Sequence, residues 1–163
     1  MAVFTIVGSK FELGAVVALK SADFVTADLT TPLVAAVEVK EPKTLGRPAD
    51  EWGTAEFTNV TDGRTRVFKM FRKGKAFDYV CGLDPLDAGQ IAMRAAFEAP
   101  ASNYAMRFSF ADKPATGASP KNSTRAFVGS VIGVDDGEGD DIGCVKFTIQ
   151  PNSNIIVVHA SAT

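Results

Sequence analysis

Apolar and polar residues alternate with a period of two along much of the chain, and this alternation predicts β-strands. In residues 104–110 every second residue is aromatic or methionine. Residues 76–81 and 142–149 alternate in the same way. Residues 126–134 are apolar at nearly every position, which is typical of a strand covered on both faces. We therefore predict a sheet that contains these four segments.

Shorter apolar runs predict further strands with turns between them. These runs cover residues 4–7, 15–19, 34–40, 55–60, 65–71 and 155–158. Asp62-Gly63 separates two of them, and Asp-Gly between strand-like runs is a strong signal of a β-hairpin. Residues 72–75 are basic and contain a glycine, so we expect the next turn there.

One helix is predicted, at about residues 84–98. Asp84 suits its N-cap, Pro85 the first helical position, and Asp87 the positive end of the helix dipole. Pro100 is expected to end it. Together with the strands, this helix indicates a mainly β (α+β) fold, namely a β-sandwich or half-barrel with one flanking α-helix.

Residues 41–53 interrupt the strand pattern with two prolines, two glycines and several charges. This composition predicts a long exposed loop or arm, and loops of that length are usually functional or mobile. Trp52 lies near its end. That side chain either folds back onto the body as an anchor or packs on a partner.

Size and composition are those of one globular domain spanning residues 1–163. Hydrophobic residues make up 46% of the chain, charged residues 22%, and the net charge is −2. The negative net charge argues against a protein that binds nucleic acid over its whole surface. Residues 64–75 are a local exception, because six cations alternate there with apolar residues. Such a hairpin could bind nucleic acid, lie exposed with its cations extended into water, or face an acidic neighbour.

No group of residues predicts catalysis, and we expect neither an enzyme nor a bound cofactor or metal. The only histidine is His159, near the C-terminus, and two cysteines are too few for a four-thiolate zinc site. Residues 135–141 are acidic but lack the ligand spacing of a calcium loop, so we expect a solvated turn. No apolar run approaches the ~20 residues of a membrane span, so membrane insertion is not expected.

The two cysteines are predicted to differ in exposure. Cys81 shares a strand face with aromatic residues and is expected to be a buried free thiol. Cys144 shares its face with Lys146 and Thr148, so we expect it to be exposed. An exposed Cys144 could form a disulfide between subunits after leaving the reducing cytoplasm.

The order of elements resembles the major tail tube proteins of tailed bacteriophages, of the lambda-like type, over roughly residues 30–158. The motifs that carry the resemblance are Asp50-Glu51-Trp52-Gly53-Thr54, Asp84-Pro85-Leu86-Asp87-Ala88-Gly89-Gln90 running into Arg94-Ala95-Ala96-Phe97, Met106-Arg107-Phe108-Ser109-Phe110-Ala111-Asp112, Phe127-Val128-Gly129-Ser130-Val131 and Val145-Lys146-Phe147-Thr148-Ile149.

The resemblance implies a structural virion protein with the phage tail tube fold. In that family, subunits form hexameric rings whose sheets join around a lumen, and the rings stack into a tube that conducts DNA into the host. Related tubes occur in contractile tails, pyocins and type VI secretion systems. The implied partners are further copies of the chain, the tape measure protein, the tail terminator, baseplate or tip proteins, a sheath protein in contractile tails, and DNA in transit. The implied location is the virion tail, with assembly in the host cytoplasm.

Unpaired sheet edges and a long arm are the features expected to make these contacts. Candidate ring-stacking residues are Glu41, Pro42, Lys43, Leu45, Arg47 and Trp52. Candidate inter-subunit or lumen residues are Arg66, Lys69, Arg72, Asp135, Asp136 and Asp140, and Cys144 is the candidate inter-subunit thiol. The alternative hypothesis is a nucleic-acid-binding β-barrel module that uses the basic hairpin at 64–75.

Overall fold

The computed structural model describes residues 7–138 and 142–162. In chain order its elements are β1 (Lys10–Val16), α1 (Thr26–Thr30), β2 (Val37–Val39), β3 (Pro42–Thr44), β4 (Ala49–Asn59), β5 (Arg64–Lys75), β6 (Phe77–Gly82), α2 (Ala88–Glu98), β7 (Tyr104–Ser109), β8 (Thr124–Glu138), β9 (Cys144–Pro151) and β10 (Ile156–Val158).

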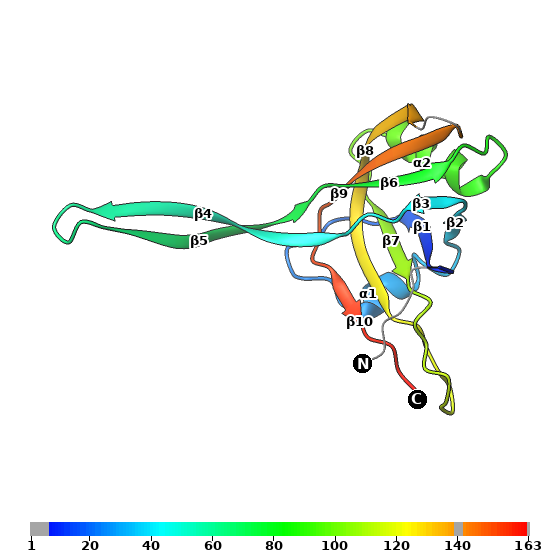
Figure 1. The fold of residues 1–163 in the computed structure, drawn as a ribbon, viewed down its shortest axis with the longest axis horizontal. Coiled ribbons are helices and arrows are strands. Elements are labelled where there is room, and N and C mark those ends of the chain that lie inside the picture. The colour runs from blue at the N-terminus through cyan, green and yellow to red at the C-terminus, as the bar shows by residue number, and fades with distance from the viewer. Residues whose placement is uncertain (1–6, 139–141, 163) are drawn as a thin grey trace.

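These strands form two antiparallel sheets. Seven strands of the larger sheet follow the order β2-β1-β7-β8-β9-β6-β3, and β10 pairs with β8 beside this path. Strands β4 and β5 pair only with each other. Figure 1 shows this pair leaving the body as a long twisted ribbon.

The large sheet curls over a single aromatic core. The ring of Phe11 on β1 lies 4.9 Å from that of Tyr79 on β6, although other strands separate β1 from β6 in the sheet. Phe77 and Phe108 approach to 5.8 Å across the same interior. The Tyr79 hydroxyl donates a hydrogen bond to the Val39 carbonyl oxygen at 2.9 Å. The observed architecture is therefore the predicted half-barrel, with α2 packed against the core.

Helix α2 begins later than predicted. Its N-cap is Asp87, whose carboxylate accepts from the Gln90 amide at 3.0 Å and the Lys40 amide at 3.3 Å. The cap thus also attaches the helix to the sheet. The prediction of Asp84 as the cap is wrong, because its carboxylate accepts from the Leu86 amide in the preceding turn. The helix ends at Glu98, just before Pro100, as predicted.

A second, smaller apolar cluster covers the opposite face of β7 and β8. Phe24 and Leu29, from the segment around α1, pack there against Ala105 and Val128. The sequence analysis did not predict the five-residue helix α1. Its presence explains why residues 126–129 of β8 are buried on both faces, as their apolar composition indicated.

Most other predicted strands are present with shifted boundaries. Only Ala15 and Val16 of the strand predicted at 15–19 belong to β1, so most of that prediction is wrong. The strand predicted at 34–40 is reduced to β2. The strand predicted at 155–158 is β10. Of residues 4–7, residues 4–6 lie outside the described part, and Val7 is in a turn.

Candidate assembly surfaces

Residues 41–53 do not form the predicted long loop. Pro42 and Thr44 of β3 pair with β6 at the edge of the large sheet, where a proline is tolerated. Leu45 follows and is buried in the core beside Phe77. The chain then enters β4 at Ala49. The pairing of β3 with β6 and the buried Leu45 therefore hold residues 42–45 against the body.

The projecting element is the β4–β5 hairpin, which we call the arm. Its strands pair from Ala49 opposite Lys75 out to Asn59 opposite Arg64. The predicted Asp62-Gly63 turn is confirmed, with Gly63 at φ 64°. The turn predicted at 72–75 is wrong, because those residues continue β5 opposite β4. At about 3.3 Å per residue, the 11 residues of β4 reach about 36 Å.

The two faces of the arm differ in character. Ala55 lies opposite Phe68 and Phe57 opposite Arg66, so these four residues share one face, which we call the aromatic face. Phe57 is 59% exposed and Phe68 52% exposed. The aromatic face thus presents two large apolar side chains to solvent on an element that projects away from the core.

The opposite face of the arm is held by polar contacts. The hydroxyls of Thr58 and Thr65 are hydrogen-bonded at 2.9 Å, and the Lys69 ammonium lies 5.7 Å from the centroid of the Trp52 ring. Trp52 therefore packs on a lysine of its own hairpin rather than in the core. Its indole remains about half exposed.

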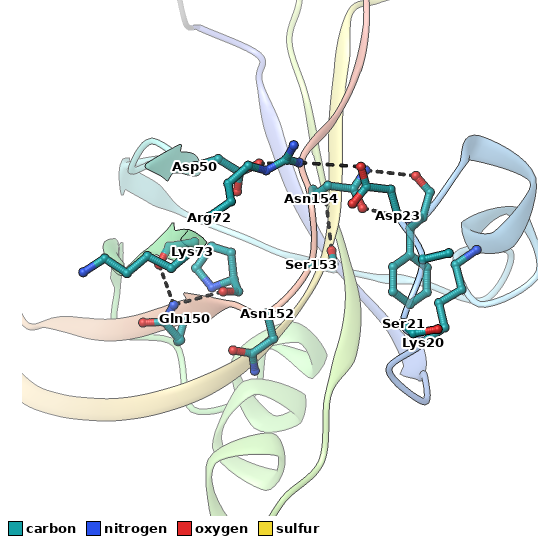
Figure 2. Close-up of a pocket in the computed structure, with 14 residues that line it drawn as sticks. Lys20, Ser21, Asp23, Asp50, Arg72, Lys73, Gln150, Asn152, Ser153 and Asn154 are labelled. Carbon is teal, nitrogen blue, oxygen red and sulfur yellow. Dashed lines mark hydrogen bonds and ion pairs between the residues drawn. The ribbon is translucent and has the colours of Figure 1, made fainter. Parts of the chain in front are cut away.

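The root of the arm is fixed to the body at several points (Figure 2). The Arg72 guanidinium lies between the carboxylates of Asp50 and Asp23, at 3.2 and 4.0 Å. The Gln150 side-chain amide donates to the Gly74 carbonyl oxygen at 2.8 Å. These groups border a polar cavity of ≈ 380 Å³. The contacts set the direction in which the arm leaves the sheet.

The remaining predicted contact residues are dispersed. Asp135 and Asp136 belong to β8 rather than to a turn, because β8 extends to Glu138 opposite the start of β9. Asp135 pairs with Lys146 at 3.1 Å. Asp136 accepts from Arg94 of α2 at 2.9 Å, and this hydrogen bond lowers the pKa of the Asp136 carboxyl. Asp140 lies outside the described residues.

The basic residues of the arm are partly neutralised by acids of the same hairpin. Arg66 pairs with Asp62 at 3.0 Å, and Lys73 pairs with Glu51 at 3.2 Å. Arg72 is engaged at the root. Arg66 lies on one face of the arm and Lys69 on the other, so the predicted contact cations do not share a face. The acids of β8 pair instead with Lys146 and Arg94.

The prediction for Cys144 is wrong, since its side chain is 3% exposed. Cys144 is the first residue of β9, where Gly82 of β6 and Glu138 of β8 flank it in register. The alternation of apolar and polar residues correctly placed Cys144 on the strand face opposite Val145. It could not reveal that the neighbouring strands β6 and β8 bury that residue. Cys81 is buried as predicted, and burial raises the pKa of its thiol to about 12.

One hollow lined by uncharged residues, both polar and apolar, was not predicted from the sequence. It lies where α2 ends against β8, has a volume of ≈ 370 Å³, and is lined by Phe97, Ala99, Pro100, Ala101, Ser102, Asn103, Ser130, Val131, Ile132 and Asn152. We call it the helix-end hollow. Phe97 is 41% exposed and Ile132 52% exposed. The sequence signal was Phe97, a large apolar residue in the last turn of a helix.

Residues 7–138 and 142–162 contain no group of three or more His, Cys, Asp or Glu side chains that could hold a metal ion. Nor does this part contain a helix long and apolar enough to cross a membrane.

Comparisons with known proteins reveal similarity in structure only. No protein-family model and no curated protein sequence matches the chain. A chain of the PVC sheath/tube terminator, from an extracellular contractile injection system in the extended state, has a TM-score of 0.63 at 8% identity, covering 97% of this chain and 98% of that one. A chain of the SPP1 tail tube has a TM-score of 0.60 at 12% identity, with coverages of 95% and 80%.

A third similar structure comes from the anti-feeding prophage baseplate. It has a TM-score of 0.60 at 5% identity and covers 98% of each chain. With identities this low, the shared property is the fold, and it extends over nearly the whole length of the chains compared. The chain therefore has the mainly β fold seen in tail tube and related injection-system proteins.

Proposed function

We propose that the chain is a structural subunit that assembles into stacked hexameric rings and forms the tube of a phage tail or a related injection particle. The single observation that carries this proposal is the arm. A two-stranded hairpin alone is marginally stable in water, and this one leaves Phe57 and Phe68 half exposed. Contact with another copy would cover that surface. The end-to-end likeness to tube and terminator structures supports the same assignment.

The open edges of the large sheet suit assembly into a ring. The large sheet is open, and its edge strands β2 and β3 have three residues each. Open edges accept strands or loops from a neighbour, and closing several sheets into a ring removes them. Ring-to-ring contacts through the arm join unlike surfaces, so they propagate into a tube rather than closing.

The sheet face formed by β6, β9 and β8 is suited to an aqueous lumen. Thr148 donates to Asp78 at 2.8 Å there, and Lys146 is paired with Asp135 on the same three strands. A polar face whose cations are already paired would let a polyanion such as DNA slide past without adhering. In this proposal DNA passes through the tube after the tape measure protein has left it.

Tail terminator and baseplate or tip proteins would cap the two ends of the tube, and in a contractile particle a sheath would surround it. The subunit would act in the virion tail after assembly in the host cytoplasm. Of the residues predicted to stack rings, Trp52 lies in the arm and keeps that role in this proposal, whereas Leu45 is buried and Pro42 is paired with β6.

The alternative of a nucleic-acid-binding module is weakened by the ion pairs of Arg66, Arg72 and Lys73. Two measurements on the purified protein distinguish the hypotheses. Sedimentation and electron microscopy at increasing concentration should reveal rings or tubes under the assembly proposal. Salt-dependent binding of the monomer to duplex DNA, abolished by neutralising Arg66, Lys69 and Arg72, would favour the alternative instead.

A further inference from the structure

We propose that the aromatic face of one copy's arm packs into the helix-end hollow of a copy in the adjacent ring. This inference rests on the proposed function and specifies the receiving surface for the arm. It assigns Phe57 and Phe68 to one side of the contact and Phe97 and Ile132 to the other.

The arm supplies an apolar surface that its own chain does not cover. Phe57 and Phe68 lie on the same face, and each is more than half exposed. Side chains of this kind provide much of the binding energy when they enter a partner's pocket. The opposite face carries the Thr58–Thr65 hydrogen bond and the lysine over Trp52, so it already has polar contacts of its own.

The helix-end hollow has the matching properties. None of the residues that line it is charged, and its volume of ≈ 370 Å³ is sufficient to seat an aromatic side chain. Phe97 and Ile132 form exposed apolar parts of its wall. An uncharged hollow bordered by exposed apolar side chains is a favourable site for a partner's aromatic anchor.

Charges beside the two surfaces are complementary. Arg64, opposite Asn59, continues the aromatic face toward the tip of the arm, whereas Arg66 is already paired with Asp62. Glu98 ends α2 next to Phe97, and the last turn of that helix contains no basic residue. The C-terminal end of a helix carries a partial negative charge, which adds to that of Glu98. An arm seated in the hollow would therefore place a cation near an anionic helix end.

The two surfaces cannot meet within one copy. The arm leaves the body as an extended ribbon, and α2 lies on the body well away from the tip of the arm (Figure 1). The contact therefore joins two copies through different surfaces. Contacts of that type leave one free arm and one free hollow at the ends of the assembly, so further rings can be added.

Cysteine cross-linking tests the register of this contact. The variant R64C/E98C places one thiol on the aromatic face and one at the end of α2. After oxidation of assembled material, we expect a ladder of multimers on a non-reducing gel, and no ladder from either single variant. T65C/E98C is the matched control, because Thr65 is adjacent in sequence but lies on the opposite face. The native Cys81 and Cys144 are buried and contribute little background.

A second variant covers the case in which the cysteine pair fails to assemble. I132R places a charge in the hollow at an exposed position, so the fold should be retained. We expect the concentration needed for tube formation to rise at least about tenfold, with single rings still formed. L86R is the control, since Leu86 is exposed before the opposite end of α2.

The outcomes separate this inference from the proposed function. Tubes of R64C/E98C without cross-links, an equal ladder from T65C/E98C, or normal tube assembly by I132R would overturn the inference and leave the tube role standing. A wild-type chain that forms neither rings nor tubes would overturn the proposed function itself.

Discussion

Gly74 of the arm lies directly against Pro151 of β9, so closely that a methyl group on Gly74 would overlap the Pro151 carbonyl oxygen. The Gly74 carbonyl also accepts from Gln150, the neighbour of Pro151. This contact joins the two-stranded arm to the large sheet at the point where β5 leaves it. The direction of the arm therefore depends on a residue without a side chain.

Substituting Gly74 by alanine should misdirect the arm. The added methyl forces β5 away from Pro151, and overpacking of this kind costs about 1–3 kcal/mol of unfolding free energy. We expect a folded protein, by circular dichroism, that forms few or no tubes. G53A is the control within the same hairpin, because a methyl there meets Phe71 only at an ordinary contact distance of 3.4 Å. Normal tubes from G74A would contradict the role of this contact.

Core and arm aromatics should respond oppositely to truncation. Phe147 is fully buried, so F147A should lower the unfolding free energy by about 3–5 kcal/mol in urea titrations. Phe57 is largely exposed, so F57A should leave monomer stability within about 0.5 kcal/mol of wild type while impairing tube formation. A large stability loss in F57A, with assembly unaffected, would show that the arm packs on its own body.

Hydrogen exchange should distinguish the arm from the body. The arm's cross-strand hydrogen bonds belong to a two-stranded ribbon without a core of its own, so its amides should exchange fast in the unassembled subunit. The amides of β7 and β9, which lie inside the large sheet, should exchange slowly. In assembled tubes the arm amides should become protected. Equal protection of the arm before and after assembly would argue against its burial in the tube.

The Asp136–Arg94 pair should give a small, acid-sensitive contribution to stability. The hydrogen bond from Arg94 lowers the pKa of the Asp136 carboxyl in the folded protein. A group whose folded pKa is lowered stabilises the protein above its unfolded pKa, about 3.9, and this contribution disappears as the pH falls through the folded pKa. Both side chains are substantially exposed, so its size should be about 0.2–1 kcal/mol.

Urea denaturation of wild type and D136N over a range of pH measures this contribution. The difference in unfolding free energy should stay constant from neutral pH to about pH 5 and diminish below about pH 4. A difference that is as large at pH 2.5 as at pH 7 would indicate a cause other than ionisation of Asp136.

Secondary-structure elements that depend on residues adjacent in the sequence were predicted correctly. Alternation over residues 104–110 is confirmed by β7, where Met106 and Phe108 face the core and Ala105 faces the smaller cluster. The Asp62-Gly63 turn is also confirmed, because a glycine there can adopt the positive φ that the turn requires. Such features depend on residues adjacent in the sequence, so the amino-acid sequence alone predicts them.

The features that define the candidate site depend on contacts between distant residues. The basic run at 72–75 suggested a turn, but its residues pair with 49–52 across the hairpin. Residues 41–53 suggested an arm, but β3 pairs with β6 and Leu45 enters the core. In both cases strand pairing outweighed local composition. Residues 49–53 of the predicted arm therefore lie in the observed arm, whereas residues 42–45 lie on the body.

Electron microscopy of the wild-type protein beside a variant with a shortened arm tests the central claim most directly. Replacing residues 53–71 by a two-residue Asn-Gly turn, which joins the paired residues Trp52 and Arg72, keeps the root contacts of Arg72 and Gly74 and removes the projecting part. We predict stacked rings and tubes from the wild type, and separate rings without tubes from the variant at the same concentration. A wild-type protein that stays monomeric at high concentration, or tubes that form equally well without the arm, would contradict the account.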